Sequence, residues 1–79
     1  MSTMAFDKEL DLRNLPCPMP VVKISKGIKE VAVGGVVKAV TTDPGARTDF
    51  PAWAKTSGNQ ILDTQESGGE VSFFIKRMK

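Results

Sequence analysis

The residues with the clearest chemical potential are Cys17 and the prolines that follow it, Pro18 and Pro20. Cys17 is the only cysteine among the 79 residues, and the chain has no histidine and no tyrosine. A disulfide scaffold, a Cys-x-x-Cys oxidoreductase, a cysteine zinc cluster and a hydrolase with a histidine base all need residues that this chain lacks. The chemistry that remains is that of a single thiol acting as a nucleophile.

The position of Cys17 favours a reactive thiolate. Pro18 and Pro20 suit the first turn of a helix, where their missing N–H groups would have no partner. The positive end of the helix dipole stabilises a thiolate, and Arg13 or Lys23 could add to this effect if their side chains turn toward the sulfur. A lone cysteine is more often a small buried apolar residue. Here the place of Cys17 after a strand, where ligands collect in open sheets, favours a functional role.

The segments on either side of Cys17 predict a strand and a helix. Residues 6–12 place apolar side chains at the period of a half-buried strand. Asn14, in the bend that follows, is one of the few residues that tolerate a left-handed backbone. After Pro20, apolar residues recur at spacings of three and four, as on one side of a helix, at Val21, Ile24, Ile28 and Val31. Gly34-Gly35 is typical of a left-handed cap that ends such a helix.

The middle of the chain predicts a second strand and a second helix. Residues 36–42 are short and β-branched, and Asp43-Pro44-Gly45 is typical of a turn. Residues 46–55 then predict a helix whose inner side carries Phe50, Trp53 and Ala54. We expect its regular part to begin near Thr48 or Asp49, because that start keeps Pro51 in the first turn, and we expect Gly58 to end it.

The last third of the chain predicts a hairpin. Residues 60–66 and 70–76 read as strands on either side of Ser67-Gly68-Gly69. The order βαβαββ predicts an α+β fold, a two-layer sandwich with two helices on one face of a four-stranded mixed sheet. The crossover helix makes the first two strands parallel. A chain of this length allows one small domain over residues 1–79, with residues 1–5 expected to be disordered.

Composition excludes other classes of protein. No apolar run approaches the roughly 18 residues that a membrane helix needs. The first residues lack the basic and then apolar pattern of a secretory signal, so we expect a cytoplasmic protein without a membrane partner. The net charge of +2, from 11 basic and 9 acidic residues, is too small to indicate direct nucleic-acid binding.

Two segments resemble the TusA family of small sulfur carriers, also called the SirA-like family. Residues 10–23 (LDLRNLPCPMPVVK) are similar to its first signature, in which a strand and an arginine lead to a Cys-Pro-x-Pro helix start. Residues 41–59 (TTDPGARTDFPAWAKTSGN) resemble its Asp-Pro turn and the Asp-apolar-Pro-x-aromatic helix start. With the closing hairpin, the resemblance covers about residues 8–78. Asn14 stands where the family most often has glycine, and Met19 fills a variable position where some carriers in tRNA modification have glutamate.

The resemblance implies the same βαβαββ sandwich and a cysteine, here Cys17, that carries sulfur as a persulfide between proteins. Such a chain is a sulfurtransferase-type covalent carrier, expected as a monomer without cofactor or metal, rather than an enzyme with its own turnover. Arg13 matches the arginine before the cysteine, and the matching prolines and turn residues are Pro18, Pro20, Asp43 and Pro44. Lys23 is a further candidate for holding the thiolate. Lys26 and Arg47 are candidates for docking a partner.

The family's partners are proteins. Its sulfur donors are cysteine desulfurases or rhodanese-like proteins, and its acceptors include tRNA thiolation enzymes, molybdenum-cofactor enzymes and DsrE-like relay proteins. Two other function classes stay open. In a regulatory or protein-interaction module Cys17 would be incidental. RNA binding would need exposed aromatic residues on the sheet, and alternation offers only Phe74, on the face opposite to Phe73.

Overall fold

The computed structural model describes residues 6–15 and 19–79. The predictions made for residues 1–5, Cys17 and Pro18 lie outside these residues. In chain order the helices and strands are β1 (Lys8–Leu12), α1 (Met19–Gly27), a short 3₁₀ turn η1 (Ile28–Glu30), β2 (Val36–Thr41), α2 (Ala46–Ser57), β3 (Gln60–Ser67) and β4 (Glu70–Lys76).

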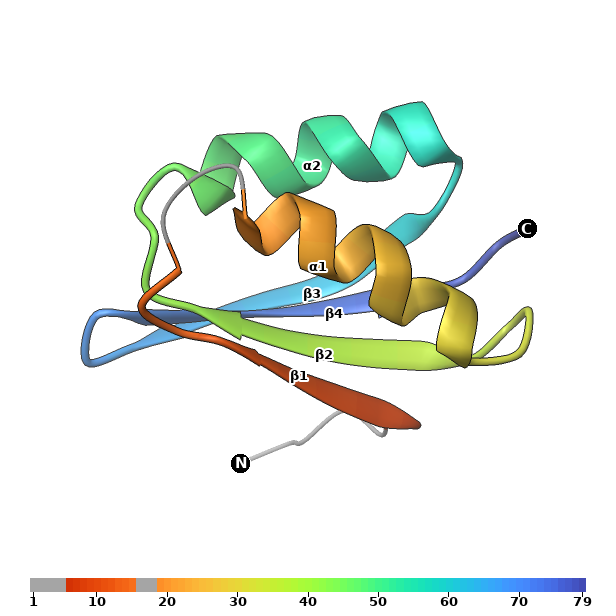
Figure 1. Cartoon of the computed structure of the whole chain (residues 1–79), viewed down its shortest axis with the longest axis horizontal. Coiled ribbons are helices and arrows are strands. Elements are labelled where there is room, and N and C mark those ends of the chain that lie inside the picture. Colours follow the sequence, from red (N-terminus) through yellow and green to blue (C-terminus); the bar gives the residue numbers. More distant parts are fainter. Residues whose placement is uncertain (1–5, 16–18) are drawn as a thin grey trace.

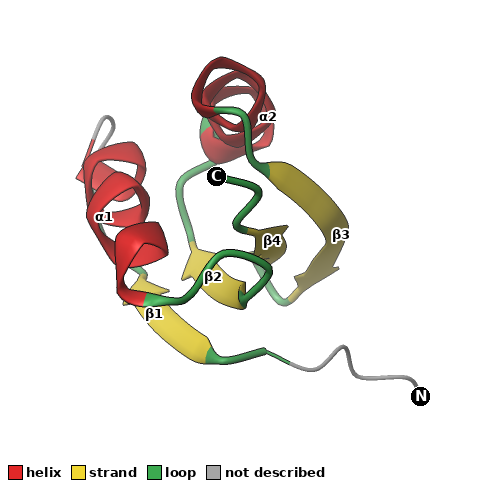
Figure 2. Ribbon diagram, turned by 90° about the vertical axis from the view of Figure 1, so that its right-hand side faces the viewer, coloured by secondary structure: helices red, strands yellow, loops and turns green. Residues whose placement is uncertain are grey.

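The strands form one mixed sheet in the order β1-β2-β4-β3. β1 runs parallel to β2, whereas β4 is antiparallel to both β2 and β3. Both helices lie on the same face of this sheet, which gives two layers (Figure 1). The view from the side shows α1 and α2 on the same side of the curved sheet (Figure 2). The predicted α+β sandwich is therefore confirmed, and so is the parallel pairing of the first two strands.

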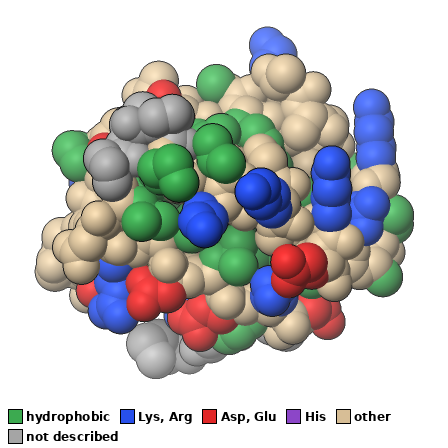
Figure 3. Space-filling view, viewed as in Figure 1, with side chains coloured by type: hydrophobic (Ala, Val, Ile, Leu, Met, Phe, Trp, Pro, Cys, Tyr) green, Lys and Arg blue, Asp and Glu red, His purple; other side chains and the backbone are tan. Residues whose placement is uncertain are grey.

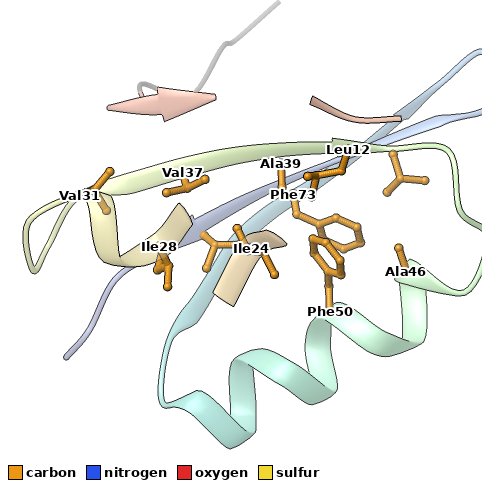
Figure 4. Packing of buried hydrophobic residues seen from close by; sticks show 11 residues of the cluster. Leu12, Ile24, Ile28, Val31, Val37, Ala39, Ala46, Phe50 and Phe73 are labelled. Carbon is orange, nitrogen blue, oxygen red and sulfur yellow. The ribbon is translucent and has the colours of Figure 1, made fainter. Parts of the chain in front are cut away.

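The core lies between the helices and the sheet (Figure 4). Phe50 of α2 points at Phe73 of β4, and their ring centroids are 4.6 Å apart. The predicted apolar side of the first helix faces the sheet, with Ile24 of α1 fully buried and Ile28 of η1 4% exposed. Burying one such side chain contributes roughly 1.5–3 kcal/mol, so this layer contact is the main source of stability.

Two predictions about the first strand and helix are wrong. β1 begins at Lys8, not at residue 6. The N–H of Asp7 still donates to the carbonyl of Val36 at 2.7 Å, but the N–H of Val36 donates to the Asp7 carboxylate at 2.8 Å and not to a strand carbonyl. The first helix ends with η1 at Glu30, so Gly34 does not cap it. Gly34, with φ of 92°, lies instead in the turn before β2.

The regular part of α1 ends at Gly27, which packs against Leu10 of β1. A Cβ atom on Gly27 would lie 2.4 Å from Cδ1 of Leu10, so only glycine permits this approach without displacing the leucine. Val31 then adopts an extended backbone and is 7% exposed. Because the helix ends early, Val31, the last residue of the predicted apolar side, can turn into the core.

The second helix is longer than predicted and places its proline differently. α2 begins at Ala46, because the N–H groups of Thr48 and Asp49 both donate to the carbonyl of Gly45. Pro51 therefore lies inside the helix and not in its first turn, at an exposed position where it cannot donate to the carbonyl of Arg47. Gly58, with φ of 79°, ends α2 as predicted.

The closing hairpin confirms the prediction and adds one detail. Gly68 and Gly69 both have positive φ, as the two central residues of a tight hairpin require. A bulge between Ile61 and Asp63 interrupts the pairing of β3 with β4. None of the helices in the described ranges is both long and apolar enough to cross a membrane.

Candidate functional site

The structure describes the two sides of the segment that contains Cys17. On the first side, β1 ends at Leu12, and Asn14 adopts the left-handed conformation that its residue type allows, with φ of 64°. The N–H of Asn14 donates to Oγ1 of Thr42 at 2.9 Å. Because Thr42 directly follows β2, this bond fixes the approach to Cys17 at the carboxyl end of the two parallel strands.

On the second side, α1 begins at Met19 and buries Pro20 fully. Burial of this proline anchors the start of the helix in the core. No acidic side chain lies in the first turn of α1, so within the described residues nothing on this helix opposes the positive end of its dipole. The predicted helix start after the Cys-Pro pair is thus present, although Cys17 and Pro18 themselves are outside the description.

The outer side of α1 exposes a mixture of apolar and basic side chains. Met19 and Val22 are 38% and 40% exposed, and Lys23 and Lys26 lie beside them on the same side of the helix. Figure 3 shows apolar and basic side chains next to one another on this face of the molecule. Among residues 6–15 and 19–79, neither lysine lies within 4.0 Å of a carboxylate oxygen. We call Met19, Val22, Lys23 and Lys26 the α1 patch.

Arg13 is held by two carboxylates. Its Nε and Nη2 donate to the two oxygens of Asp11 at 2.9 and 3.0 Å, and its Nη1 donates to Oε2 of Glu70 at 3.3 Å. The side-chain hydrogen bonds from Arg13 lower the pKa of Asp11 to about 2, and the bonds to Asp11 and Glu70 raise the pKa of Arg13. The guanidinium charge is therefore largely compensated.

These bonds draw Arg13 toward the face of the sheet that the helices leave open. Asp11 pairs with Val40, and Val40 pairs with Ser72, on the strand positions opposite to the core residues. We call this side of the sheet the open face. The predicted contact of Arg13 with the Cys17 thiolate is not one of the described contacts and stays a prediction.

Sequence reasoning missed two threonine hydroxyls, of which one connects the two signature segments and the other shapes the second segment. Thr42 accepts from Asn14, and Oγ1 of the buried Thr41 accepts from the N–H of Asp43 at 3.1 Å. Asp43 in turn accepts from the N–H of Gly45 at 3.0 Å, which shapes the turn into α2. Pro44 is exposed in this turn. The pair of threonines before an Asp-Pro turn was the available signal, since such hydroxyls commonly bond to neighbouring loops.

The remaining predicted site residue, Arg47, is exposed on α2 and forms an ion pair with Glu66 of β3. Arg47 and Glu66 line the same shallow hollow as Asp43 and Pro44, at the end of the sheet that also carries Asn14. The structure thus brings Arg47 and the Asp43-Pro44 turn together. It places Lys26 elsewhere, on the outer side of α1.

Phe74 does not offer an aromatic surface to RNA. It points to the open face, as alternation predicts, but it is fully buried. The ring of Phe6 lies against it with centroids 6.3 Å apart, and the ammonium of Lys38 lies 5.8 Å from the Phe74 centroid. The expectation of an exposed Phe74 is wrong, because Phe6 and Lys38 lie against the ring.

No group of three or more acidic, cysteine or histidine side chains that could hold a metal occurs within the described ranges. Together, the fold and the site define a small α+β protein that presents a cysteine segment between a strand and a helix. Comparison with known proteins leads to the same class. Residues 8–77 match the model of the family described as sulfurtransferase TusA, and the chain belongs to this family.

Individual proteins agree with this assignment. The sulfur carrier protein TusA of Allochromatium vinosum is 40% identical over 72 residues, which cover 91% of this chain and 95% of that protein. A putative sulfur carrier protein of Aquifex aeolicus is 39% identical over 77 residues, which cover 98% of this chain and 39% of that longer protein. The crystal structure of a SirA-like protein from Desulfitobacterium hafniense has the same fold, with a TM-score of 0.79, 23% identity and coverage of 92% and 100% of the two chains.

Proposed function

We propose that this chain is a sulfur carrier that receives sulfane sulfur as a persulfide on Cys17 from a donor protein and passes it to an acceptor protein. The observation that carries this proposal is the family match over residues 8–77, which spans the chain's only cysteine. The relatives named as sulfur carriers support it.

The proposed transfer needs one thiol on this chain. The Cys17 thiolate attacks the outer sulfur of a persulfide on the donor cysteine, the S–S bond of the donor breaks, and the donor leaves as a thiolate. An acceptor thiolate later attacks the outer sulfur on Cys17 and regenerates the Cys17 thiolate. A second cysteine nearby would instead form an intramolecular disulfide and release the sulfur early. A chain with one cysteine avoids this loss.

The start of α1 supplies the activation in this proposal. Its N–H groups and dipole favour the thiolate, and the first turn of α1 carries no acidic side chain. Lys23, one turn into the helix and without a described carboxylate partner, adds positive charge. Arg13 would have to leave Asp11 and Glu70 to do the same. We therefore assign activation to the helix start and Lys23 before Arg13.

Partner docking is assigned to the α1 patch. Its apolar members, Met19 and Val22, follow Cys17 closely in the chain, and its lysines are available to acidic side chains of a partner. Such a surface fits proteins that bring a cysteine persulfide to Cys17, such as a cysteine desulfurase or a rhodanese-like donor. A DsrE-like or thiolation enzyme would use it in the second transfer. Arg47 is a weaker docking point because Glu66 already binds it.

The test is a loading experiment. The purified protein is incubated with a cysteine desulfurase and cysteine, and separately with a rhodanese and thiosulfate, and its intact mass is recorded before and after dithiothreitol. We expect a gain of one sulfur that the reductant reverses, and no gain in Cys17→Ser. Reversal separates a persulfide from a sulfinic acid of nearly equal mass.

Failure of both donors with a folded protein and an alkylatable Cys17 would contradict the proposal. That outcome would favour the regulatory or protein-interaction module, in which the α1 patch binds a partner and Cys17 is incidental. A pull-down with and without iodoacetamide then checks the module, because alkylation of an incidental cysteine leaves partner affinity unchanged.

A further inference from the structure

A groove between the ends of α1 and α2 lies away from the Cys17 segment. It has a volume of about 300 Å³ and opens between η1, the last turn of α2 and the final residues of the chain. Its lining includes three basic side chains, an indole and two polar side chains at the end of α2: Lys29, Arg77, Lys79, Trp53, Ser57 and Asn59. Since Cys17 precedes the first residue of α1 and Lys29 follows its last, the helix separates the groove from the sulfur site.

One of the basic side chains, Arg77, is positioned by backbone oxygens. Nη1 of Arg77 donates to the carbonyl of Val31 at 2.7 Å, and Nε donates to the backbone oxygen of Lys79 at 2.7 Å. Oδ1 of Asn59 accepts from the N–H of Met78 at 3.1 Å, which holds the same segment against the end of α2. Arg77 is therefore fixed at the groove by backbone oxygens and not by an Asp or Glu side chain.

The groove also has an excess of basic side chains. Within the described ranges, no Asp or Glu lines it and none of its three basic side chains lies within 4.0 Å of an Asp or Glu carboxylate oxygen. Cations elsewhere, such as Arg13, Lys38 and Arg47, each have such a partner. Three like charges that converge on a hollow repel one another and attract an anion of small size.

The polar wall supplies hydrogen-bond donors. Nδ2 of Asn59 donates to Oγ of Ser57 at 2.9 Å. The Ser57 hydroxyl itself donates to the carbonyl of Ala54 over a long 3.4 Å, so its proton can turn toward a ligand at little cost. Trp53 is half-buried and adds a flat apolar wall.

We propose that this groove binds a tetrahedral oxyanion of the phosphate or sulfate type. Charge-assisted bonds from Lys29, Arg77 and Lys79 hold the oxygens, and Ser57 donates a further bond. The oxyanion can be a free ion or the phosphate of a nucleotide whose base lies against Trp53. The proposal goes beyond sulfur carriage and requires nothing of Cys17.

The chain's only tryptophan lies in the groove, and the chain has no tyrosine, so intrinsic fluorescence reports on this site. We would titrate the full-length protein with sodium phosphate and with sodium sulfate at constant ionic strength set by sodium chloride. Adenosine monophosphate, which absorbs in the ultraviolet, is followed instead through the Trp53 indole N–H in NMR spectra. We expect saturable binding. Tighter binding of the nucleotide than of phosphate identifies a phosphate ester as the ligand, and equal or weaker binding identifies the free oxyanion.

The variants Lys29→Gln and Lys79→Gln should each weaken binding about fivefold. Lys55→Gln on the exposed side of α2 is the matched control and should bind like the wild type, as should Cys17→Ser. A linear response without saturation, or equal affinity in the Lys29→Gln/Lys79→Gln double variant and the control, would overturn the proposal. Because Cys17→Ser retains binding, either result is independent of sulfur loading.

Discussion

The open face of the sheet differs from two regions of the helical face, the α1 patch and the groove, in how charged side chains are paired. On the open face, Arg13 binds Asp11 and Glu70, and Lys38 lies 3.8 Å from a carboxylate oxygen of Glu9. On the helical face Arg47 binds Glu66, but the lysines of the α1 patch and the three cations of the groove have no described Asp or Glu partner. Charged side chains that are already paired within the molecule attract a charged partner only weakly. Cations without an acidic side-chain partner over an apolar helix surface favour association with acidic groups.

The faces also differ in how they bury aromatic side chains, and this difference predicts the largest effect. Phe50→Ala removes a fully buried ring from between the layers and should lower the free energy of unfolding by about 3–5 kcal/mol. Phe6, which is 38% exposed on the open face, is the matched control. Urea denaturation should show a loss for Phe6→Ala of less than about 1.5 kcal/mol. Equal losses would contradict the idea that the interlayer contact dominates stability.

The Arg13 contacts give a prediction about protonation. In Arg13→Ala, the pKa of Asp11 should rise from about 2 toward its ordinary value near ~3.9, because its main cause, the hydrogen bond from Arg13, is gone. Carboxyl chemical shifts followed by NMR against pH measure this. In Glu70→Gln the pKa of Asp11 should stay low, since the bidentate contact remains. A normal pKa of Asp11 in the wild type would show that Arg13 is not held on the open face.

The same contacts fix the sign of a pH effect on stability. Because the folded pKa of Asp11 lies below the unfolded value, the contribution is present above pH ~4 and is lost as the pH falls toward about 2. Wild-type stability should therefore decline over this window by more than that of Arg13→Ala. Urea midpoints measured from pH 5 to pH 2 on both proteins would show parallel declines if the contact did not form in solution.

The smallest expected effect concerns the exposed pair of Lys38 and Glu9. Glu9→Gln should change the free energy of unfolding by less than about 1 kcal/mol, because surface ion pairs are weak and screened. The difference should shrink further in high salt. A larger loss, or one that does not depend on salt, would mean that the open face contributes more to stability through its charges than the comparison allows.

Local patterns were sufficient to predict most of the fold. The spacing of Ile24, Ile28 and Val31, the left-handed tolerance of Asn14 and the paired glycines at 68 and 69 each depend on near neighbours in the chain. The predictions were wrong at positions whose structure depends on residues far away in the sequence. The end of α1 depends on how Gly27 meets Leu10, which spacing along the sequence does not contain.

The features of the site also divide into those set by near neighbours and those set by distant residues. Its cysteine, its helix start and the Asp43 turn follow from residue types in sequence order. Arg13 binds Asp11 close by in the chain, but its additional bond to Glu70 joins residues 57 positions apart, and the burial of Phe74 depends on Phe6. The groove around Trp53 exists only because the last residues pack between the two helix ends. Such long-range pairings become visible only when the elements are placed in space.

The most direct test of sulfur carriage across the helical face is the rate at which a persulfide-loaded cysteine desulfurase transfers sulfur to Cys17. Lys23→Glu/Lys26→Glu reverses the charge of the α1 patch, and Lys55→Glu/Lys76→Glu changes the net charge equally elsewhere. We expect the first variant to load at least about tenfold more slowly than the wild type at low salt, and the second to load nearly as fast. Equal rates in both variants, or loading that survives Cys17→Ser, would contradict sulfur transfer to Cys17 across the α1 patch.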